Sequence, residues 1–498
     1  MKGRSGTVGD VTRTYRTGLI PNPSGMPIAA WKSSKPSTGQ VASISADIFF
    51  GRNDVSKSNS VAIDVSAVTT INKFEDDRNH FHDAIRPILL VAQCFAVLPV
   101  SGIRYSDPSH LTFTWKSPKI IYYVISFCGA GVLMICSLAR VWVTGITATK
   151  TTNVVFFGSA CITMLLFLRL ATRWPKFIRD WEKVEGEMTS PPPATSRMRL
   201  KNRLALMTGI TMSLAVVEHL LSVYSGYASA LECAFLRGDT DIVSTYFQSQ
   251  FPQVFHLTGY SLWKGMLVQC VNILSTFSWN FMDLFLMLLS FALTERFRQM
   301  NERLYSVRGK YCFVVKEMPD WWWLEAREDY NRLANLTRRV DQCVSDIVLL
   351  SFANNLYFIC IQLLNSLKYI TLIAIPRRGI PQTIYTSFSF AFLIARTVAV
   401  SLYAAAVNDQ SLRPSPILYS VSATSYSTEV QRFLTQATTD RIGLTGLNFF
   451  AVTRSLILTV AGTIVTYELV LVQFNGMQNV DAAVFNITNA CEDFISVP

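Results

Sequence analysis

Three apolar stretches of the sequence carry hydrogen-bonding side chains at helical spacing. Side chains three, four or seven residues apart share one face of a helix. Carboxylates, amides and hydroxyls on such a face donate or accept hydrogen bonds, so the face either lines a binding site or joins neighbouring helices. The three faces consist of Glu218, Ser222, Ser225 and Ser229; of Gln269, Asn272, Thr276, Trp279 and Asp283; and of Asn355 and Gln362.

A further set of polar side chains lies near the C-terminus, in the stretch TYELVLVQF that begins at Thr466. In a helix of about 3.6 residues per turn, Thr466 and Phe474 lie within about 40° of Val470, and Gln473 within about 60°. Glu468 lies roughly 160° away. A face of this composition can line a water-filled pore that valine and phenylalanine close by dewetting. Glu468 then points into its own subunit, where it contacts the pocket helices or simply bonds a neighbour.

The elements that carry these side chains are predicted to be membrane-spanning helices. Half of the 498 residues are hydrophobic and only 16% are charged, against about 25% charged in soluble proteins. A bilayer span needs roughly 20 mostly apolar residues. Eight stretches match this pattern, which predicts an all-α membrane protein. They are residues 83–103, 118–146, 152–172, 203–231, 265–293, 345–373, 382–407 and 449–474.

Loop charge predicts the orientation of these helices, because Lys and Arg accumulate in cytoplasmic loops. The basic segments 173–202 and 294–344 are expected inside, and the segments 147–151 and 232–264, with few cations, outside. Pro and Gly interrupt the first stretch, 83–103, which fits a re-entrant helix better than a span. Seven spans remain, with the N-terminus in the cytoplasm and the C-terminus outside.

Polar segments flank the predicted helices at both ends of the chain. Residues 1–80 are rich in Ser, Thr, Gly and Asn and contain no apolar leader region, so a disordered cytoplasmic segment is expected. Residues 475–498 follow the last span and are expected to be extracellular. This tail contains a glycosylation sequon at Asn486, which agrees with that side of the membrane.

The sequence argues against several classes of function. The net charge of +11 is distributed over the loops beside the spans, so no nucleic-acid partner is expected. The ten cysteines include no CxxC pair, so no metal, redox centre or other cofactor is expected. Because P-loop, HExxH and GxSxG motifs are absent, we expect neither an enzyme with catalytic residues nor a transporter.

The chain resembles the insect gustatory receptor family, and in particular its sugar-receptor branch. The stretch TYELVLVQF is similar to the TY-five-residue-QF signature in the last helix of that family. The resemblance extends over most of the chain from Phe81 to Phe474. Three further stretches carry it, namely FHDAIRPILLVAQCFAVLPVSGI, WNFMDLFLMLLSFAL and NNLYFICIQLLNS.

The resemblance implies a fold and a mechanism. Gustatory receptors are similar to insect odorant receptors, whose seven-helix subunits form tetramers with one central cation pore lined by the last helices. Ligand binds among the helices near the outer face, and cytoplasmic helical extensions form a shared anchor. The expected protein is therefore a sugar-gated, non-selective cation channel of the plasma membrane. It is expected to form a homotetramer, or a heterotetramer with other gustatory receptor subunits.

A sugar suits the polar faces, because its hydroxyls donate and accept hydrogen bonds while its C–H faces stack on aromatic rings. Packing between helices is the alternative role for these side chains. The expected ligand-binding residues are Glu218, Ser222, Gln269, Asn272, Trp279, Asp283, Asn355, Gln362 and Tyr385. The expected pore residues are Thr466, Val470, Gln473 and Phe474, and Glu468 is expected to couple ligand to pore.

Two alternative interpretations share much of this pattern. A gustatory receptor for a non-sugar tastant would have the same fold. A G-protein-coupled receptor also has seven spans, but its orientation is opposite, and the chain has no DRY after the third span and no NPxxY in the last. The three tryptophans Trp321–Trp323 lie in the basic segment 294–344 and are expected to pack in the anchor or at the membrane interface.

Overall fold

A computed structural model describes residues 80–146, 148–188, 199–238, 241–307, 318–371 and 380–478. Within these ranges, the side chains of residues 148, 149, 236, 237, 365–371, 467, 468 and 471–478 are not described. The predictions for the N-terminal segment before residue 80, for the tail after residue 478 and for the sequon at Asn486 fall outside the described residues.

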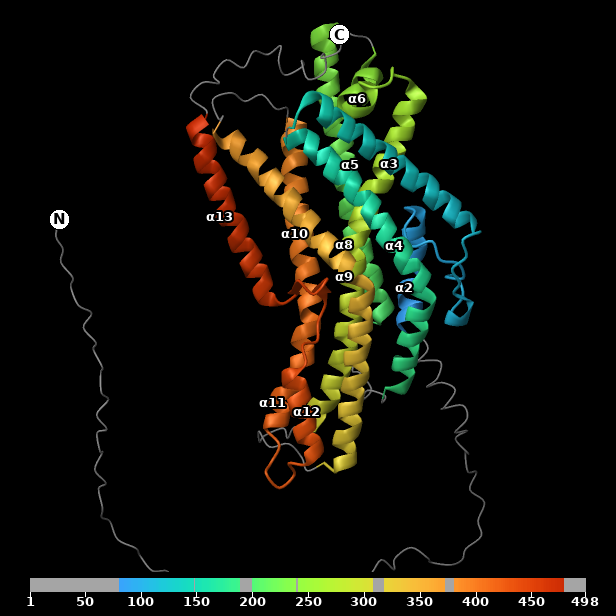
Figure 1. Cartoon of the computed structure of the whole chain (residues 1–498), viewed down its shortest axis with the longest axis vertical. Coiled ribbons are helices and arrows are strands. Elements are labelled where there is room, and N and C mark those ends of the chain that lie inside the picture. Colours follow the sequence, from blue (N-terminus) through green and yellow to red (C-terminus); the bar gives the residue numbers. More distant parts are fainter. Residues whose placement is uncertain are drawn as a thin grey trace, which may run out of the picture. The chain divides into compact units, whose positions relative to one another are not determined.

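Most of the apolar stretches fold into long helices, and several of these helices extend beyond the stretches themselves (Figure 1). In the described part of the chain, six helices are long and apolar enough to cross a membrane. The longest has 52 residues, where a span needs roughly 20, so part of it reaches beyond a bilayer. The six are α3 (Pro118–Thr144), α4 (Ala148–Glu187), α5 (Leu200–Arg237), α8 (Leu262–Ser306), α9 (Asp320–Thr371) and α10 (Ile380–Leu412).

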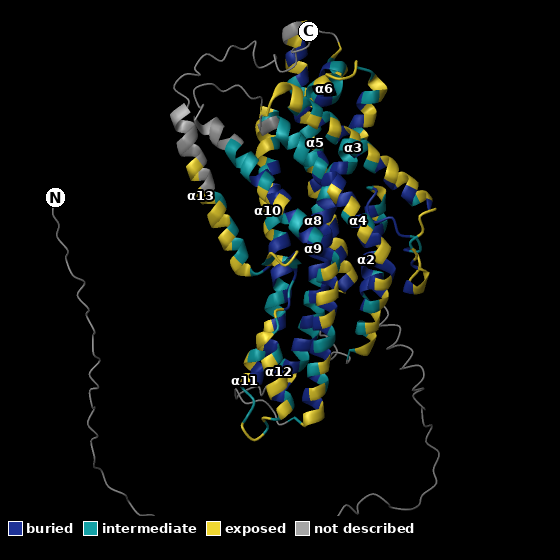
Figure 2. Ribbon diagram, in the orientation of Figure 1, coloured by how far each residue is buried: buried dark blue, intermediate teal, exposed yellow. Residues whose placement is uncertain are grey.

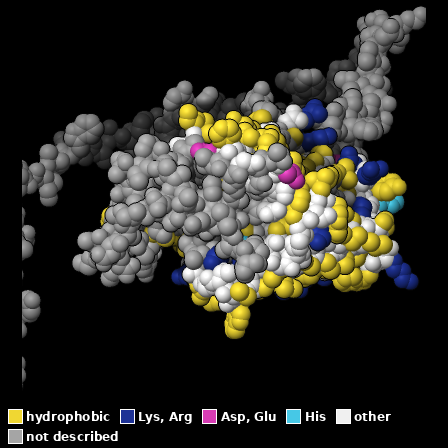
Figure 3. Space-filling view, turned by 90° about the horizontal axis from the view of Figure 1, so that it is seen from above, with side chains coloured by type: hydrophobic (Ala, Val, Ile, Leu, Met, Phe, Trp, Pro, Cys, Tyr) yellow, Lys and Arg dark blue, Asp and Glu magenta, His cyan; other side chains and the backbone are white. Residues whose placement is uncertain are grey.

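Apolar side chains cover much of the outside of these helices. Ile125, Ile135 and Leu220 are about as exposed as surface residues of a soluble protein, at 66%, 60% and 61%. The view along the long axis also shows many hydrophobic side chains and few Asp or Glu side chains on the described part of that face (Figure 3). Because exposed apolar patches of this extent belong to lipid or to partners, the chain is a multi-pass membrane protein. The number of spans and their orientation stay predictions.

The helix α8 occupies the centre of the bundle. In the most apolar 18 residues of α8, 83% are buried inside the protein, whereas the same share for α5 is 11%. Figure 2 shows the arrangement of these helices. Phe281 and Phe285 of α8 pack on Phe167 of α4, with ring centroids 6.0 and 5.3 Å apart. A central helix must carry any polar side chain either into a cavity or against a partner, since no lipid or water surrounds it.

The helix α2 (Phe81–Cys94) has 14 residues, too few to cross the hydrocarbon core. Phe81, Ile85 and Leu89 are fully buried against the other helices. The chain then turns back on itself, and Gly102 adopts a φ of 84°, which favours glycine. A Cβ at Gly102 would lie 2.0 Å from a backbone oxygen. A short buried helix agrees with a re-entrant segment, whose entry into a bilayer stays a prediction.

The hydropathy pattern did not predict several short elements. All of them lie outside the apolar stretches except the strand Phe450–Ala451, which falls at the start of the stretch 449–474. Two of them stand near the end of the bundle labelled α6 in Figure 1, and others near the opposite end. The only described strands form a two-residue antiparallel pair with Thr445 opposite Ala451. These elements are η2 (Pro108–His110), α6 (Ile242–Gln250), α7 (Pro252–Phe255), α11 (Ser415–Tyr419), α12 (Thr428–Thr439), β1 (Thr445–Gly446) and β2 (Phe450–Ala451).

The end of the bundle opposite α6 is held by aromatic packing. Trp322 and Trp323 are buried, at 7% and 0% exposure, whereas Trp321 is 64% exposed. Tyr330 of α9 packs on Phe433 of α12, with ring centroids 5.4 Å apart. Two of the three tryptophans therefore pack inside this helical extension, and the third faces outward.

The last helix, α13 (Arg454–Gln478), lies at the edge of the bundle beside α9 and α10 (Figure 1). None of its described side chains is buried (Figure 2). Leu458, Val465 and Leu469 are exposed at 77%, 57% and 60%. This helix therefore makes little contact with the rest of the described protein.

Candidate ligand-binding pocket

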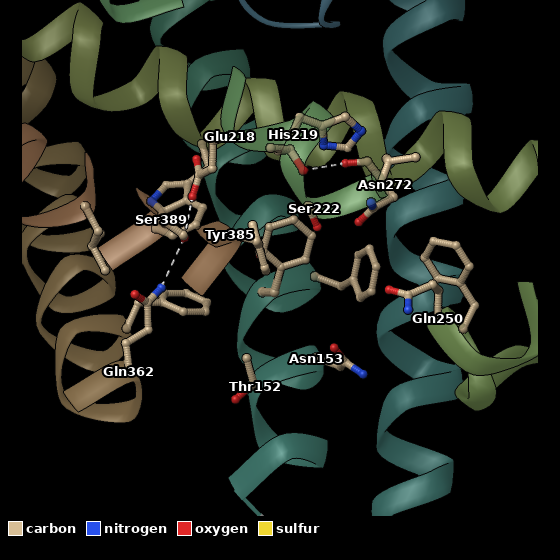
Figure 4. Close-up of a pocket in the computed structure, with 18 of the residues that line it drawn as sticks. Thr152, Asn153, Glu218, His219, Ser222, Gln250, Asn272, Gln362, Tyr385 and Ser389 are labelled. Atoms are coloured by element: carbon tan, nitrogen blue, oxygen red, sulfur yellow. Dashed lines mark hydrogen bonds between the residues drawn. The ribbon is translucent and has the colours of Figure 1, made fainter. Parts of the chain in front are cut away.

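A cavity of about 380 Å³ lies among α4, α5, α8, α9 and α10, beside the short helices α6 and α7 (Figure 4). This volume falls within the roughly 300–1,000 Å³ of typical small-molecule sites. Seven of the predicted ligand-binding residues line the cavity, from four different helices. They are Glu218, Ser222, Gln269, Asn272, Trp279, Gln362 and Tyr385.

Helical spacing explains how α8 supplies one wall. Gln269, Asn272, Thr276 and Trp279 succeed one another at three and four residues and all line the cavity. On α10, the intervals are four residues from Tyr385 to Ser389 and seven from Ser389 to Arg396, and all three side chains line the facing wall. The two helices pack directly against each other, so their polar faces open into one shared space.

A chain of hydrogen bonds crosses the pocket between α5, α10 and α9 (Figure 4). The Ser389 hydroxyl donates to Glu218 Oε1 at 2.6 Å, and Gln362 Nε2 donates to Ser389 Oγ at 3.4 Å. On another wall, Gln269 Nε2 and His219 Nε2 lie 3.4 Å apart. These contacts hold a carboxylate and two amides at fixed positions around the cavity.

An aromatic surface forms the side of the pocket around Trp279. The indole packs on Phe358, with ring centroids 4.7 Å apart, and on Phe156, at 6.2 Å. The guanidinium carbon of Arg396 lies 4.5 Å from the Trp279 ring centroid. This cation–π contact orients the arginine and the indole together at the pocket floor.

Among the polar atoms buried in the pocket wall, Gln253 Oε1 and Gln269 Oε1, both acceptors, lack a hydrogen-bond partner within the described part of the protein. The indole nitrogen of Trp279, a donor, also lacks one there. Leaving such a group unpaired costs roughly 1–3 kcal/mol. A ligand that both donates and accepts hydrogen bonds would remove this cost, and an apolar ligand would not.

Asp283 and Asn355 were expected to bind ligand, but they lie beneath the pocket and not on its wall. Asp283 is fully buried, and its Oδ2 lies 2.8 Å from Arg396 Nε. Ser351 Oγ donates to its Oδ1 at 2.5 Å, and Asn355 Nδ2 donates to its Oδ2 at 3.2 Å. Arg396 also donates to Asn280. The network joins α8, α9 and α10, and only Arg396 reaches from it into the pocket.

The chain matches the family model described as trehalose receptor over residues 53–483. This match covers most of the sequence.

The chain belongs to the trehalose receptor family.

Similar proteins from Drosophila melanogaster agree with this assignment. The gustatory receptor 5a for trehalose is 36% identical over 408 residues, which cover 82% of this chain and 88% of the relative. The gustatory receptor for sugar taste 64f is 35% identical over 397 residues, covering 79% of this chain and 81% of the relative. The resemblance to sugar gustatory receptors seen in the sequence is thereby confirmed.

The fold of this trehalose receptor family member is similar to that of an insect olfactory receptor. The structure of OR5 from Machilis hrabei in complex with eugenol superposes with a TM-score of 0.54 at 14% identity. The match covers 80% of this chain and 100% of the olfactory receptor chain. At this identity the likeness shows the fold alone, which agrees with the expected similarity in fold to odorant receptors.

Several pocket residues of this family member were missed by the sequence argument. Arg396 is a cation in the middle of the apolar stretch 382–407, a position that by itself indicates an intramembrane partner or site. Thr152 and Asn153 open α4, and Gln250 and Gln253 lie in α6 and α7. These four had no periodic signal, because each belongs to a helix end or to a short helix of the segment 232–264.

The remaining predicted site residues lie on α13, away from the pocket wall. Thr466 and Val470 are exposed, and Thr466 Oγ1 donates to Gly462 O at 2.9 Å. Glu468, Gln473 and Phe474 belong to the same helix, and their side chains lie outside the description. Their assignment to a pore and to coupling stays a prediction.

Proposed function

We propose that this protein is a gustatory receptor in which a sugar, bound in the pocket around Trp279, opens a cation channel. The observation that carries the proposal is the composition of the pocket. Amides, a carboxylate and hydroxyls surround one aromatic surface, and most of them come from long, packed helices. The names of the relatives, one for trehalose and others for sugar taste, support a sugar as the ligand.

The charge of the pocket favours a neutral ligand. Glu218 and Arg396 are the charged lining residues, and the guanidinium of Arg396 is already paired with Asp283. An anion would meet the Glu218 carboxylate and no uncompensated cation. A neutral polyol instead matches Gln269 Oε1 and the Trp279 indole nitrogen, which need a donor and an acceptor.

The channel part of the proposal rests on α13. All described side chains of this helix remain at least partly exposed, so its apolar surface must be covered by something outside the described part of this chain. We propose that four copies of the helix, one from each subunit of a tetramer, surround one pore. Thr466, Val470, Gln473 and Phe474 face that pore, and Glu468 faces the pocket helices. The sugar opens the pore only if it binds the open state more tightly than the closed state.

The proposed orientation places the pocket at the outer face of the plasma membrane. The helices α6 and α7 belong to the segment 232–264, which has few cations, and their residues line the pocket. The N-terminus is then cytoplasmic, and seven spans cross the membrane. A tastant arriving from outside could reach the pocket without crossing the hydrocarbon core.

Calorimetric titration of the purified protein with trehalose and a panel of other sugars tests the ligand. Gln269→Met removes one unpaired acceptor from the wall at nearly constant volume, so we expect about tenfold weaker binding of the best sugar. Gln248→Met makes the same change on the exposed face of α6, outside the pocket, and should bind like the wild type. Equal binding by both variants would exclude Gln269 from the site, and binding of apolar compounds alone would exclude a sugar pocket.

A further inference from the structure

A second cavity, of about 510 Å³, opens between α4 and α9. It is well separated from the sugar pocket. On α4, Asn153 lines the pocket and Arg173 lines this second cavity, and at about 1.5 Å per residue the two lie roughly 30 Å apart along the helix. The hydrocarbon core of a bilayer has about the same thickness. The residues around the opening are Arg173, Lys176 and Asp180 of α4, with Arg339 and Gln342 of α9.

Positive charge dominates this cavity, which we call the basic cleft. Three cations and one carboxylate line it, which leaves two positive charges in excess. Arg339 is compensated, because its NH1 lies 3.1 Å from Asp180 Oδ2. Within the described part of the chain, neither Arg173 nor Lys176 forms an ion pair, and both are exposed. These two cations remain available to an anion.

The floor of the basic cleft is apolar. Phe177 and Leu336 lie there with only 6% and 2% of their surface exposed. One helical turn from Arg173, Arg169 is paired with Asp346 of α9, which neutralises the side of the cleft nearer the apolar part of the helices. The site therefore combines a cationic rim with a small hydrophobic base, a pattern that suits an amphiphile better than a free ion.

The basic cleft lies where the apolar parts of both helices end. The apolar stretch 152–172 of α4 stops one residue before Arg173, and the stretch 345–373 of α9 begins two residues after Cys343. Lipid headgroups occupy this level of a membrane. Lys and Arg at such a level attract anionic lipids, and an arginine fork can bind two oxygens of one phosphate.

We propose that the basic cleft binds the phosphorylated headgroup of an anionic membrane phospholipid. Arg173 and Lys176 contact the phosphate, whose double negative charge as a monoester matches the excess positive charge. The Arg339–Asp180 pair forms the opposite wall, and Phe177 and Leu336 lie beneath the glycerol backbone of the lipid. This assignment is independent of the sugar and of the pore.

The test measures lipid binding by the purified full-length protein in detergent. Thermophoresis with dioctanoyl phosphatidylinositol bisphosphate gives the dissociation constant, and dioctanoyl phosphatidylcholine serves as the neutral probe. The double variant Arg173→Gln/Lys176→Gln should bind the phosphoinositide about tenfold more weakly or worse, since each cation at an anionic headgroup contributes severalfold. Because both side chains are exposed, the variant should elute from size exclusion like the wild type.

A matched control removes the same charge from the same two helices. Lys183→Gln/Arg338→Gln changes exposed cations outside the cleft and should leave the dissociation constant unchanged. Equal binding by wild type and cleft variant, or equal loss in the control, would overturn the proposal. It would also be overturned if inositol trisphosphate alone bound as tightly as the lipid, because the site would then belong to a soluble phosphate.

Discussion

Two carboxylates near the pocket differ in their surroundings and therefore in their expected roles. Glu218 lies on the wall, where the Ser389 hydroxyl donates to it and a ligand can reach it. Asp283 is fully buried and has Arg396, Ser351 and Asn355 as partners. The sequence placed both carboxylates on polar helix faces and could not distinguish their roles. The reason is that Arg396, the counter-ion of Asp283, belongs to a different helix, α10.

Asp283→Asn should destabilise the protein rather than change its ligand preference. The substitution leaves the Arg396 guanidinium buried without its counter-ion, which typically costs about 3–5 kcal/mol. We expect a clearly lower unfolding temperature in detergent. Asp440→Asn breaks the partly exposed pair with Arg338 and should cost no more than about 1 kcal/mol. If Asp283→Asn unfolded like the wild type and only weakened sugar binding, Asp283 would be a ligand contact after all.

Among the elements, periodicity within long helices was the most informative signal. The spacing from Gln269 to Trp279 predicted one wall of the pocket, because α8 is central and its polar face has to open into a cavity. The same spacing also included Asp283, one turn further on, where the cavity ends. The helices α6 and α7 are too short to produce a periodic pattern of polar residues. For α9, the hydropathy pattern predicted only the apolar part of a longer helix.

The last helix is expected to have two faces with different effects on current. Val470→Ser should wet the proposed constriction and give current without sugar. Gln473→Glu should change ion preference, because this side chain is proposed to lie in the ion path. Glu468→Gln should leave ion preference nearly unchanged but weaken the response to sugar. Single-channel conductance, ion preference and basal activity of the three variants check these expectations.

The comparison among the three variants is internally controlled, since all three lie within two turns of α13. A change of ion preference in Glu468→Gln, with Val470→Ser and Gln473→Glu behaving like the wild type, would mean that the helix is rotated by about half a turn. The proposed pore face would then be wrong.

At the scale of the whole molecule, composition and the apolar stretches predicted a multi-pass helical membrane protein, and the six long apolar helices agree. The orientation follows from charges in segments such as 173–202, part of which lies outside the described residues. Assembly cannot be derived from one chain, because lipid and partner copies can both cover the apolar surface that α13 leaves exposed.

Epitope tags on the two ends of the chain test the orientation. An N-terminal tag should stay unlabelled by antibody on intact cells and become labelled after permeabilisation, because the basic segments 173–202 and 294–344 favour a cytoplasmic N-terminus. A C-terminal tag should be labelled on intact cells. Labelling of the N-terminal tag from outside would instead give the orientation of a G-protein-coupled receptor.

The central claim is that one protein both binds the sugar and conducts the ions. Current recorded from the purified protein in a planar bilayer, without any G protein, tests it most directly. We expect sugar-evoked cation current whose dose–response curve shifts to higher sugar concentration in Glu218→Gln. That variant loses the carboxylate charge that accepts from Ser389 and that is proposed to accept from a ligand hydroxyl. Sugar binding without any current, while current appears only when a G protein and a separate channel are added, would contradict the account.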